Sequence, residues 1–513
     1  MRNPMKLTCF SLALSGVFLA FSGVVCAQTT LTAAVDYTLR NNPDVAIDAR
    51  QRRSVDEALL GAYSGYLPKV DIGWGIGREK AKNNNTNYQW SEYLTRHEKS
   101  VTLQQMLFDS FATANEVARN RARMQSAAYK VSGSSEQIAL KVVEAYLNVL
   151  RLRENVRLTQ ENLENHQKTY DQISLRASSG IGRQSDVDQA EARLALAKSN
   201  LVSAEANLRD AEITYQRYTG MMPDELIQPE GPTEVMMPKS LEDAIEKARA
   251  NNPLLKQSKA DIEAANAQYD AAKSAFGPRF DIQAGMNYLD NSGGIEGDND
   301  SKYAMVRMNW NLLRGGADYA RLGEMKQLSY QAIDIMKRTL MQLDESTSLS
   351  WNTYVSAHER LPNLQQHAES SLATRDAYTK QFSIGQRTLI DLLDTENEYY
   401  TSTVEYVNGQ YMELFARYRL MADMGHLLAS LDVKPLIESD PTQRIEHSSP
   451  WSRSDYKKSQ TRQTAVQEEP AQLELETGSD QAGNAAPVEE PASLAKEPVL
   501  QPQPDLLPAS ATP

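Results

Sequence analysis

Residues 31–43 read LTAAVDYTLRNNP and residues 241–253 read LEDAIEKARANNP, so a short segment with the same ending occurs twice. Further residues agree at the same offset: Pro68 with Pro278, Asp71 with Asp281 and Gly75 with Gly285. At an offset five residues shorter, agreement resumes for Gly180 with Gly385, Asp186 with Asp391 and Glu191 with Glu396. This pattern indicates that one structural unit has been duplicated, and both copies are expected to contain the same elements in the same order.

Residues 1–27 have the features of a cleaved secretory signal: a basic start, an apolar run and small residues at the end. Both cysteines, Cys9 and Cys26, lie inside this segment, so the mature chain is predicted to have no disulfide, thiol or cysteine metal site. An alternative is a lipoprotein anchored at Cys26. That alternative requires a small residue before the cysteine, where the sequence has Val25.

The composition argues against several classes of protein. A formal net charge of -13 and a pI of about 5.2 disfavour a nucleic-acid partner, because a polyanion would be repelled. The six histidines are scattered without the spacing of a ligand set, so neither a metal nor another cofactor is predicted. After the signal, no stretch has the roughly 18 apolar residues of a membrane-spanning helix, so a passage through a bilayer would need β-strands.

Each half of the chain predicts a helix, two strands, a long helix and another helix. In the first half, a helix over about residues 31–66 is expected to stop before Pro68. Residues 70–76 then alternate apolar side chains with glycine or aspartate, as in a strand with one apolar face. The other strands are expected near residues 101–108, 280–288 and 304–312. Four strands are too few to close a barrel, so several chains would have to pool them.

The longest helices carry a seven-residue repeat. From Val187 onward, valine, leucine or tyrosine recurs at every seventh position with alanine three positions later, which indicates a coiled-coil seam. The helix before it, if continuous over residues 109–175, would be roughly 100 Å long, too long for a compact globular domain. Pro362 lies in the corresponding helix of the second half, where a kink or break is expected.

The predicted organisation has five parts. These are a signal peptide (residues 1–27), a first structural repeat (28–220), a proline-rich connector (221–239), a second structural repeat (240–435) and a tail (436–513). The tail is acidic and rich in proline, glutamine, alanine and serine, with few large apolar residues. Such a segment buries too little apolar surface to fold, so it is expected to be disordered.

Residues 382–394 read FSIGQRTLIDLLD, which resembles the periplasmic tip of TolC-like outer-membrane channel proteins. With the duplication, the Asn-Asn-Pro repeats and the secretory signal, the resemblance covers about residues 29–431. It implies an α+β membrane protein and a homotrimer. Twelve strands, four from each chain, would form one outer-membrane β-barrel that continues into a long α-helical coiled-coil tunnel across the periplasm.

The resemblance also implies a gate at the periplasmic end of the tunnel. Arg387 matches the gate arginine of the family, Asp186 its aspartate partner, and Ser185 stands where the family can have threonine. A guanidinium against a carboxylate is directional and can be broken, as a latch requires. Phe382 departs from the family pattern, in which a tyrosine can supply a hydroxyl link, so one hydrogen bond of the latch is in question. The alternative is that Arg387 and Asp186 are ordinary solvated helix charges.

Asp391 and Asp394 are one helical turn apart on one face of the predicted helix. In a trimer they would form two stacked rings of three carboxylates, matching the acidic constriction of the family, and such rings attract cations. Two alternatives stay open. One is a plain solvated face, and the other is a catalytic acid and base pair, which needs an enclosed pocket that nothing in the sequence provides. The chain is therefore not expected to be an enzyme.

The sequence thus favours a passive exit duct in the outer membrane, extending into the periplasm and contacting outer-membrane lipid. It would serve a tripartite export system, and among such systems type I protein secretion is favoured. A periplasmic adaptor would open it and an inner-membrane transporter of ABC type would supply the energy, since the chain has no nucleotide-binding loop. The alternative is the outer-membrane component of a drug or metal efflux pump. A more distant alternative is a periplasmic coiled-coil scaffold or adhesin.

Overall fold

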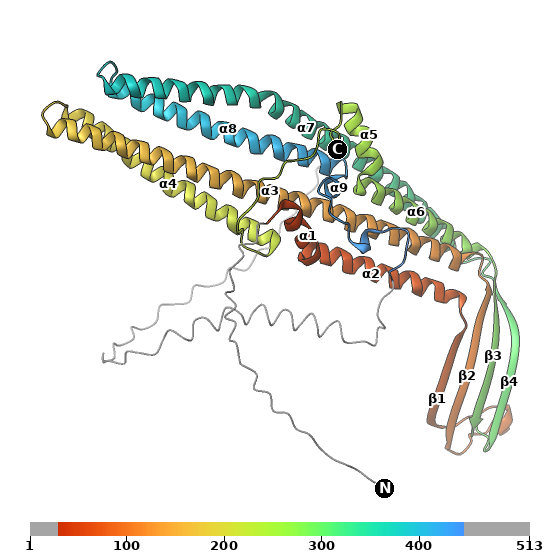
Figure 1. Cartoon of the computed structure of the whole chain (residues 1–513). Helices are drawn as coiled ribbons and strands as arrows, with labels where there is room; N and C mark the ends of the chain where they lie inside the picture. Colours follow the sequence, from red (N-terminus) through yellow and green to blue (C-terminus); the bar gives the residue numbers. More distant parts are fainter. Residues whose placement is uncertain (1–28, 446–513) are drawn as a thin grey trace, which may run out of the picture. The chain divides into compact units, whose positions relative to one another are not determined.

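The computed structural model describes residues 29–445, which comprise two copies of one unit (Figure 1). The first copy consists of α1 (Leu31–Asn41), α2 (Pro43–Tyr63), β1 (Lys69–Glu79), β2 (Leu94–Phe108), α3 (Ala112–Ser178) and α4 (Gln184–Thr219). The second consists of α5 (Leu241–Asn251), α6 (Pro253–Lys273), β3 (Arg279–Asp290), β4 (Asp298–Asn309), α7 (Ala317–Ser383) and α8 (Leu389–Asp423). The short helix α9 (Leu427–Ser430) follows, and single 3-10 turns lie at Ser64–Tyr66, Asn84–Thr86, Ser274–Phe276 and Ile437–Ser439. Both α3 and α7 have 67 residues, so the duplication extends to helix length.

The single helix predicted over residues 31–66 is wrong, because the chain breaks at Asn42. This residue has an extended backbone (φ -70°, ψ 129°) and Pro43 begins the next helix, where its missing N–H is not needed. The Asn42 side chain accepts a hydrogen bond from the Asp44 N–H at 2.9 Å and caps α2. Its amide donates to the Tyr218 carbonyl in the last turn of α4 at 3.0 Å. One side chain therefore joins the start of α2 to the end of α4.

Asn252 repeats this arrangement in the second copy. Its side chain accepts from the Leu254 N–H at 2.9 Å and donates to the Asp423 carbonyl, the last residue of α8, at 2.9 Å. Helix ends leave backbone N–H and C=O groups without partners, and one amide side chain can satisfy both kinds. The repeated Asn-Asn-Pro sequence therefore marks the point at which α2 is attached to the end of α4, and α6 to the end of α8.

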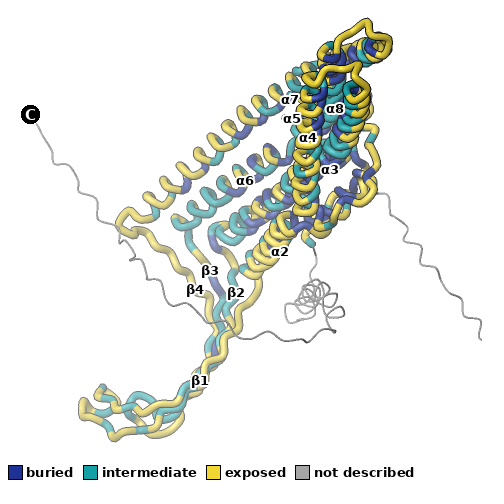
Figure 2. Tube along the Cα trace, turned by 90° about the vertical axis from the view of Figure 1, so that its left-hand side faces the viewer, coloured by how far each residue is buried: buried dark blue, intermediate teal, exposed yellow. Residues whose placement is uncertain are grey.

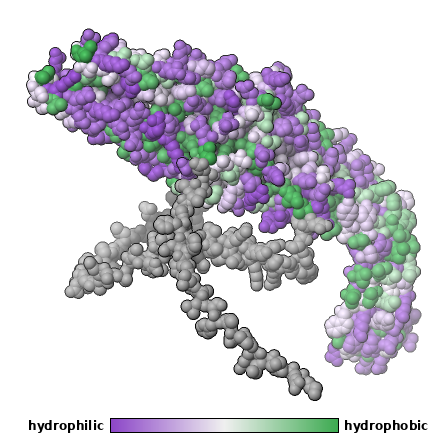
Figure 3. Space-filling view, viewed as in Figure 1, coloured by the Kyte–Doolittle hydropathy of each residue, from purple (hydrophilic) through white to green (hydrophobic). Residues whose placement is uncertain are grey.

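The four strands form one antiparallel sheet in the order β1-β2-β3-β4. The return strands begin earlier than predicted, since β2 starts at Leu94 and β4 runs from Asp298 to Asn309. The predicted apolar face of β1 is exposed, with Ile72 and Trp74 at 80% and 70%. Hydrophobic side chains gather over the strands, whereas the hairpin loops beyond them are more hydrophilic (Figure 3). No described residue of the same chain covers this face, and none of the helices in residues 29–445 is long and apolar enough to span a membrane.

The long helices form two antiparallel pairs, α3 with α4 and α7 with α8 (Figure 1). The predicted seam of α4 is buried, as Val187, Ala190, Leu194 and Ala197 show. The predicted break at Pro362 is wrong, because α7 continues through it. The side chain of Leu364 lies so close to Gly409 of α8 that a Cβ there would be 2.7 Å from its Cδ1 atom. The missing side chain of Gly409 thus allows α7 to pack tightly beside its proline.

Burial is concentrated where the middle of α3 meets α1, α8 and α9, in a cluster that also includes Ala244 and Ala248 of α5 (Figure 2). Within this core, the Glu136 carboxylate of α3 accepts a hydrogen bond from the Leu427 N–H at 3.1 Å, at the start of α9. Glu136 is 8% exposed. Burial raises the pKa of Glu136 to about 7, against the lowering effect of bonds from the Leu427 and Leu428 backbone. A titratable group therefore joins the end of the second copy to the first.

The predicted disorder of the tail does not hold for residues 436–445. A 3-10 turn forms at Ile437–Ser439, and Arg53 of α2 donates to the Glu438 carboxylate at 2.9 Å. The buried Arg52 donates to the Gln443 carbonyl at 3.0 Å. These contacts attach the segment to α2, which composition alone could not indicate. The remainder of the tail, the signal segment and both cysteines lie outside the described residues.

Replacing the joining asparagine tests its role. Asn42→Ala removes a helix cap and leaves the Tyr218 carbonyl without its donor, so the free energy of unfolding should fall by about 2 kcal/mol. Urea denaturation of the purified protein measures this change. The exposed neighbour Asn41 donates only to the Tyr37 carbonyl of its own helix. Asn41→Ala should therefore change the free energy by roughly 0.5 kcal/mol or less, and equal losses in both variants would contradict this account.

A second prediction concerns pH. The folded-state pKa of Glu136 is raised from 4.5 to about 7. Between these values the folded protein retains a proton that the unfolded chain has lost, so the free energy of unfolding falls as pH rises, by about 3 kcal/mol at most. Glu136→Gln should remove this part of the slope in urea titrations across that range. Glu164→Gln, at an exposed position of the same helix, should keep the slope of the wild type. An unchanged slope in Glu136→Gln would refute the assignment.

Candidate functional site

Two tight turns form one end of the long helices (Figure 1). One joins α3 to α4 at Gly180 and the other joins α7 to α8 at Gly385, with φ angles of 77° and 79°. These angles lie in the left-handed region, where a residue with a side chain is strained. The matched glycines of the two copies therefore build matched turns, and all the predicted gate residues lie on or beside them.

Phe382 lies in an apolar cluster that joins the two turns. It is 7% exposed and is buried with Ile173, Val187, Leu389, Leu392 and Leu393. The guanidinium carbon of Arg176 lies 5.0 Å from the centre of its ring, within range of a cation–π contact. Phe382 thus packs the last turn of α7 against α3, whereas a tyrosine would also bring a hydroxyl group to this place.

Arg387 is exposed and lies on the α7–α8 turn. Its Nε donates to Gln381 Oε1 at 2.9 Å, and its guanidinium carbon lies 4.0 Å from the centre of the Tyr378 ring. Within the described part of one chain, no carboxylate lies within 4.0 Å of it. Asp186, half-buried in the first turn of α4, and the exposed Ser185 lie at the same end of the helices. One chain therefore brings these side chains to one end without pairing Arg387 with Asp186.

Asp391 caps its own helix. The Thr388 hydroxyl and backbone N–H donate to its Oδ2 at 2.9 and 3.1 Å, and the Asp391 N–H donates back to the Thr388 hydroxyl at 3.2 Å. These bonds are the main reason that the pKa of Asp391 is lowered, with a smaller contribution from the Arg387 charge. Asp391 is therefore held ionised in a fixed orientation at the start of α8.

Asp394 has a partner on the other helix pair. Its Oδ1 lies 3.4 Å from Arg193 Nη2 of α4, and the two side chains are 63% and 35% exposed. A pair this exposed contributes little to stability. Within one chain, no cluster of three His, Cys, Asp or Glu among the described residues is placed to hold a metal ion. A cation site built on Asp391 or Asp394 would have to be shared between chains.

Four side chains that orient the predicted ones were not expected from the sequence: Thr388, Gln381, Tyr378 and Arg193. The first was detectable, because Thr388 stands three residues before Asp391 and matches the spacing of a capping box. Gln381 and Tyr378 act across a turn, and Arg193 acts between two helices. Those three contacts depend on tertiary geometry, so no local pattern indicates them.

The matches to known proteins include both copies of the unit. The family model described as "Outer membrane efflux protein" matches residues 34–221 and 244–426, one segment in each copy of the unit. The outer membrane efflux protein BepC from Brucella suis biovar 1 is 26% identical over 436 residues, covering 84% of this chain and 93% of that protein. The alkaline protease secretion protein AprF from Pseudomonas aeruginosa is 21% identical over 395 residues, covering 74% of this chain and 79% of that protein.

The fold is also similar to that of solved structures. The outer-membrane channel OprN superposes with a TM-score of 0.67 at 17% sequence identity, covering 77% of this chain and 89% of that one. At this identity the likeness concerns the fold. It confirms the predicted fold class, in which a four-stranded sheet per chain continues into long paired helices.

Proposed function

This chain belongs to the outer membrane efflux protein family, and we propose that it is the passive exit duct of a tripartite export system that serves type I protein secretion. The protein is located in the outer membrane and extends into the periplasm. The expectation that it is a channel and not an enzyme is confirmed by the family. The periplasmic scaffold or adhesin is thereby excluded.

The main observation in favour of the proposed duct is the open sheet. Its edge strands β1 and β4 each have one side without a neighbour, and the apolar face of β1 is exposed. Unpaired strand edges cannot face lipid, because their backbone groups would lack partners. Three chains that pool their strands satisfy every edge, and outer-membrane lipid covers the apolar face. The helices, about 100 Å long at 1.5 Å per residue, then continue the duct into the periplasm.

The other partners follow from the absence of an energy source in the duct itself. A periplasmic adaptor opens the tip, and an inner-membrane transporter of ABC type drives the cargo. BepC is named an efflux protein and AprF a secretion protein, so relatives of both kinds match this chain. Secretion is favoured by the long acidic sequence after residue 445 and by Val25, which does not suit a lipoprotein signal. Drug or metal efflux is the second candidate, and it is favoured by the higher identity to BepC.

The gate of this duct lies at the paired turns. Arg387 of one chain bonds Asp186 of the next, with Ser185 as a further hydroxyl partner and Phe382 anchoring the turn from inside. The exposed guanidinium of Arg387 has no carboxylate partner among residues 29–445 of its own chain, which leaves it available to a neighbour. Asp391 and Asp394 of the three chains form the acidic constriction. The cap from Thr388 supports this role, because it keeps Asp391 ionised.

The energy of such a latch is suited to switching. An exposed ion pair contributes about 0 to 1 kcal/mol, so three copies contribute up to about 3 kcal/mol. Inverting an equilibrium from 99:1 to 1:99 takes about 5.5 kcal/mol, an amount that the binding of an adaptor can supply. The closed state is thus held firmly enough to prevent leakage and weakly enough to yield to a partner.

Removing both partners of the latch should open the gate. Arg387→Ala with Asp186→Ala removes up to about 3 kcal/mol from the closed trimer, which corresponds to roughly a 100-fold change in the ratio of closed to open. Entry of a large antibiotic into a sensitive host that expresses the variant should increase. The matched control is Lys380→Ala with Asp188→Ala, which removes the same charges from exposed positions near the same turns. Equal uptake in both double variants would count against the latch.

Deletion of the gene separates the two kinds of cargo. If the duct serves type I secretion, the deletion strain should lose a secreted protein from its culture medium and keep its resistance to drugs and metals. Comparative proteomics of the medium and inhibitory concentrations measure the two properties, with the plasmid-borne gene as the control for complementation. Normal secretion together with drug hypersensitivity would reverse the order of the two candidates.

A further inference from the structure

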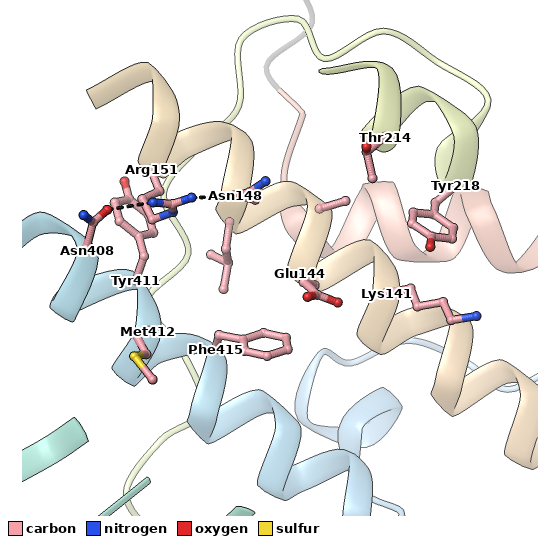
Figure 4. Close-up of a pocket in the computed structure, with 12 residues that line it drawn as sticks. Lys141, Glu144, Asn148, Arg151, Thr214, Tyr218, Asn408, Tyr411, Met412 and Phe415 are labelled. Carbon is pink, nitrogen blue, oxygen red and sulfur yellow. Dashed lines mark hydrogen bonds between the residues drawn. The ribbon is translucent and has the colours of Figure 1, made fainter. Parts of the chain in front are cut away.

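A pocket of about 520 Å³ lies between three long helices, far from the paired turns (Figure 4). The floor is α3, with Lys141, Glu144 and Arg151. One wall is α4 with Tyr218, and the other is α8 with Tyr411 and Phe415. Its volume falls within the range of about 300 to 1,000 Å³ that is usual for small-molecule sites. Neither the gate nor the apolar seams of the helix pairs explain this space.

The pocket opens on one particular side of the helical layer. Tyr146 of α3 lies two residues from Glu144 and from Asn148, which both line the pocket, so it points to nearly the opposite side of the helix. Its hydroxyl lies within hydrogen-bond distance of the carbonyls of Thr29 and Ile227, which share its one proton and belong to the first described residues and to the connector. In the proposed duct we place these added segments on the outer side of the helical layer, where they do not obstruct the path of the cargo. The pocket then faces the interior.

Positive charge is in excess in the pocket. Arg151 donates to the side-chain oxygens of Asn148 and Asn408, each at 2.7 Å, and these two amides fix the orientation of its guanidinium (Figure 4). Lys141 lies 5.9 Å above the ring of Tyr218. Neither cation has a carboxylate within 4.0 Å among the described residues of the chain, and Glu144 is the only acidic residue in the lining. The lining thus has two cations and one carboxylate, and Arg151 and Lys141 lie at opposite ends of it (Figure 4).

The remaining surface of the pocket is apolar and aromatic. The ring of Phe415 lies across from Glu144, whereas Tyr411 lies beside Arg151, with Met412 on the same side of the pocket (Figure 4). Burial also lowers the pKa of Arg151, since a charged guanidinium here has lost part of its water. An anion would restore favourable interactions for that charge, and an aromatic body attached to it would cover the apolar wall.

We propose that this pocket binds small amphipathic organic anions, with the anionic group on Arg151 and the apolar body against Tyr411 and Phe415. The proposal rests on the proposed duct, because only the interior of a channel would bring such compounds to this face. It extends the cargo from proteins to small organic anions, which bind in passing and are released again. Binding should be weak, with a dissociation constant on the order of 1 mM for a ligand of this size.

Equilibrium dialysis tests the proposal with the whole protein in lipid nanodiscs and naphthoate as the probe. Empty nanodiscs correct for partition into lipid. Arg151→Gln should weaken binding roughly tenfold or more, because a hydrogen-bonded charge is removed. Glu144→Gln should strengthen binding, since it removes the opposing charge. Arg157→Gln is the matched control: this exposed arginine of α3 pairs with Glu154 and Glu161, away from the pocket, and its loss should change nothing.

The possible results distinguish a failure of the proposed pocket from a failure of the proposed duct. Naphthalenemethanol, a neutral analogue, and naphthylmethylammonium, a cation, should bind at least roughly tenfold more weakly than naphthoate. Equal binding of all three compounds, or the same affinity in Arg151→Gln as in Arg157→Gln, would overturn the proposal. Conductance of the same preparation in a planar bilayer is measured in parallel. Conductance without selective naphthoate binding refutes the pocket alone, whereas a folded protein without conductance refutes the duct on which the pocket depends.

Discussion

Two asparagine side chains, Asn42 and Asn252, connect helix ends that would otherwise have unsatisfied backbone groups. The side-chain oxygen of each caps a helix, α2 or α6. The side-chain nitrogen donates to a carbonyl at the end of α4 or α8. The constraint is geometric, since it determines where α2 leaves the pair α3–α4 and where α6 leaves the pair α7–α8. Helices α2 and α6 in turn lead directly into the strands, so the placement of the sheet depends on these two residues.

The helical part combines two kinds of interface. Within the pairs α3–α4 and α7–α8 the contacts are close and largely apolar, as at Val187, Leu194 and Gly409. Between α3 and α8 the buried core and the cluster around Phe382 are also apolar, and polar contacts lie between them, with Arg151 bonded to Asn408 and Thr159 to Tyr400. Water can replace a polar contact at a small net loss, whereas exposing an apolar seam loses the full hydrophobic contribution. The polar stretch between the two apolar clusters is therefore the part of this junction that can rearrange with the smallest loss.

The sequence predicted those features that repeat or alternate. The duplication, the four strands, the paired long helices and the family could all be recognised from spacing, because periodic burial leaves a periodic pattern. Prediction from the sequence failed where a single residue determines whether a helix ends or continues. Asn42 breaks a helix and bonds the end of α4, α7 continues through Pro362 with Gly409 of α8 close to Leu364, and residues 436–445 are held by two arginines. At the tip, Asp391 and Asp394 stay predictions, and the contact of Asp394 with Arg193 could not be predicted, since it joins distant segments.

The central claim is that three copies of this chain form a duct with an acidic constriction. Single-channel conductance in a planar bilayer tests it most directly, comparing the wild type with Asp391→Asn/Asp394→Asn, with and without a divalent cation on the periplasmic side. Asparagine at position 391 can still accept the bonds from Thr388, so the helix start is kept. We expect a small, cation-preferring conductance that divalent cations block in the wild type and not in the variant. No conductance from folded protein that reaches the outer membrane would contradict the account.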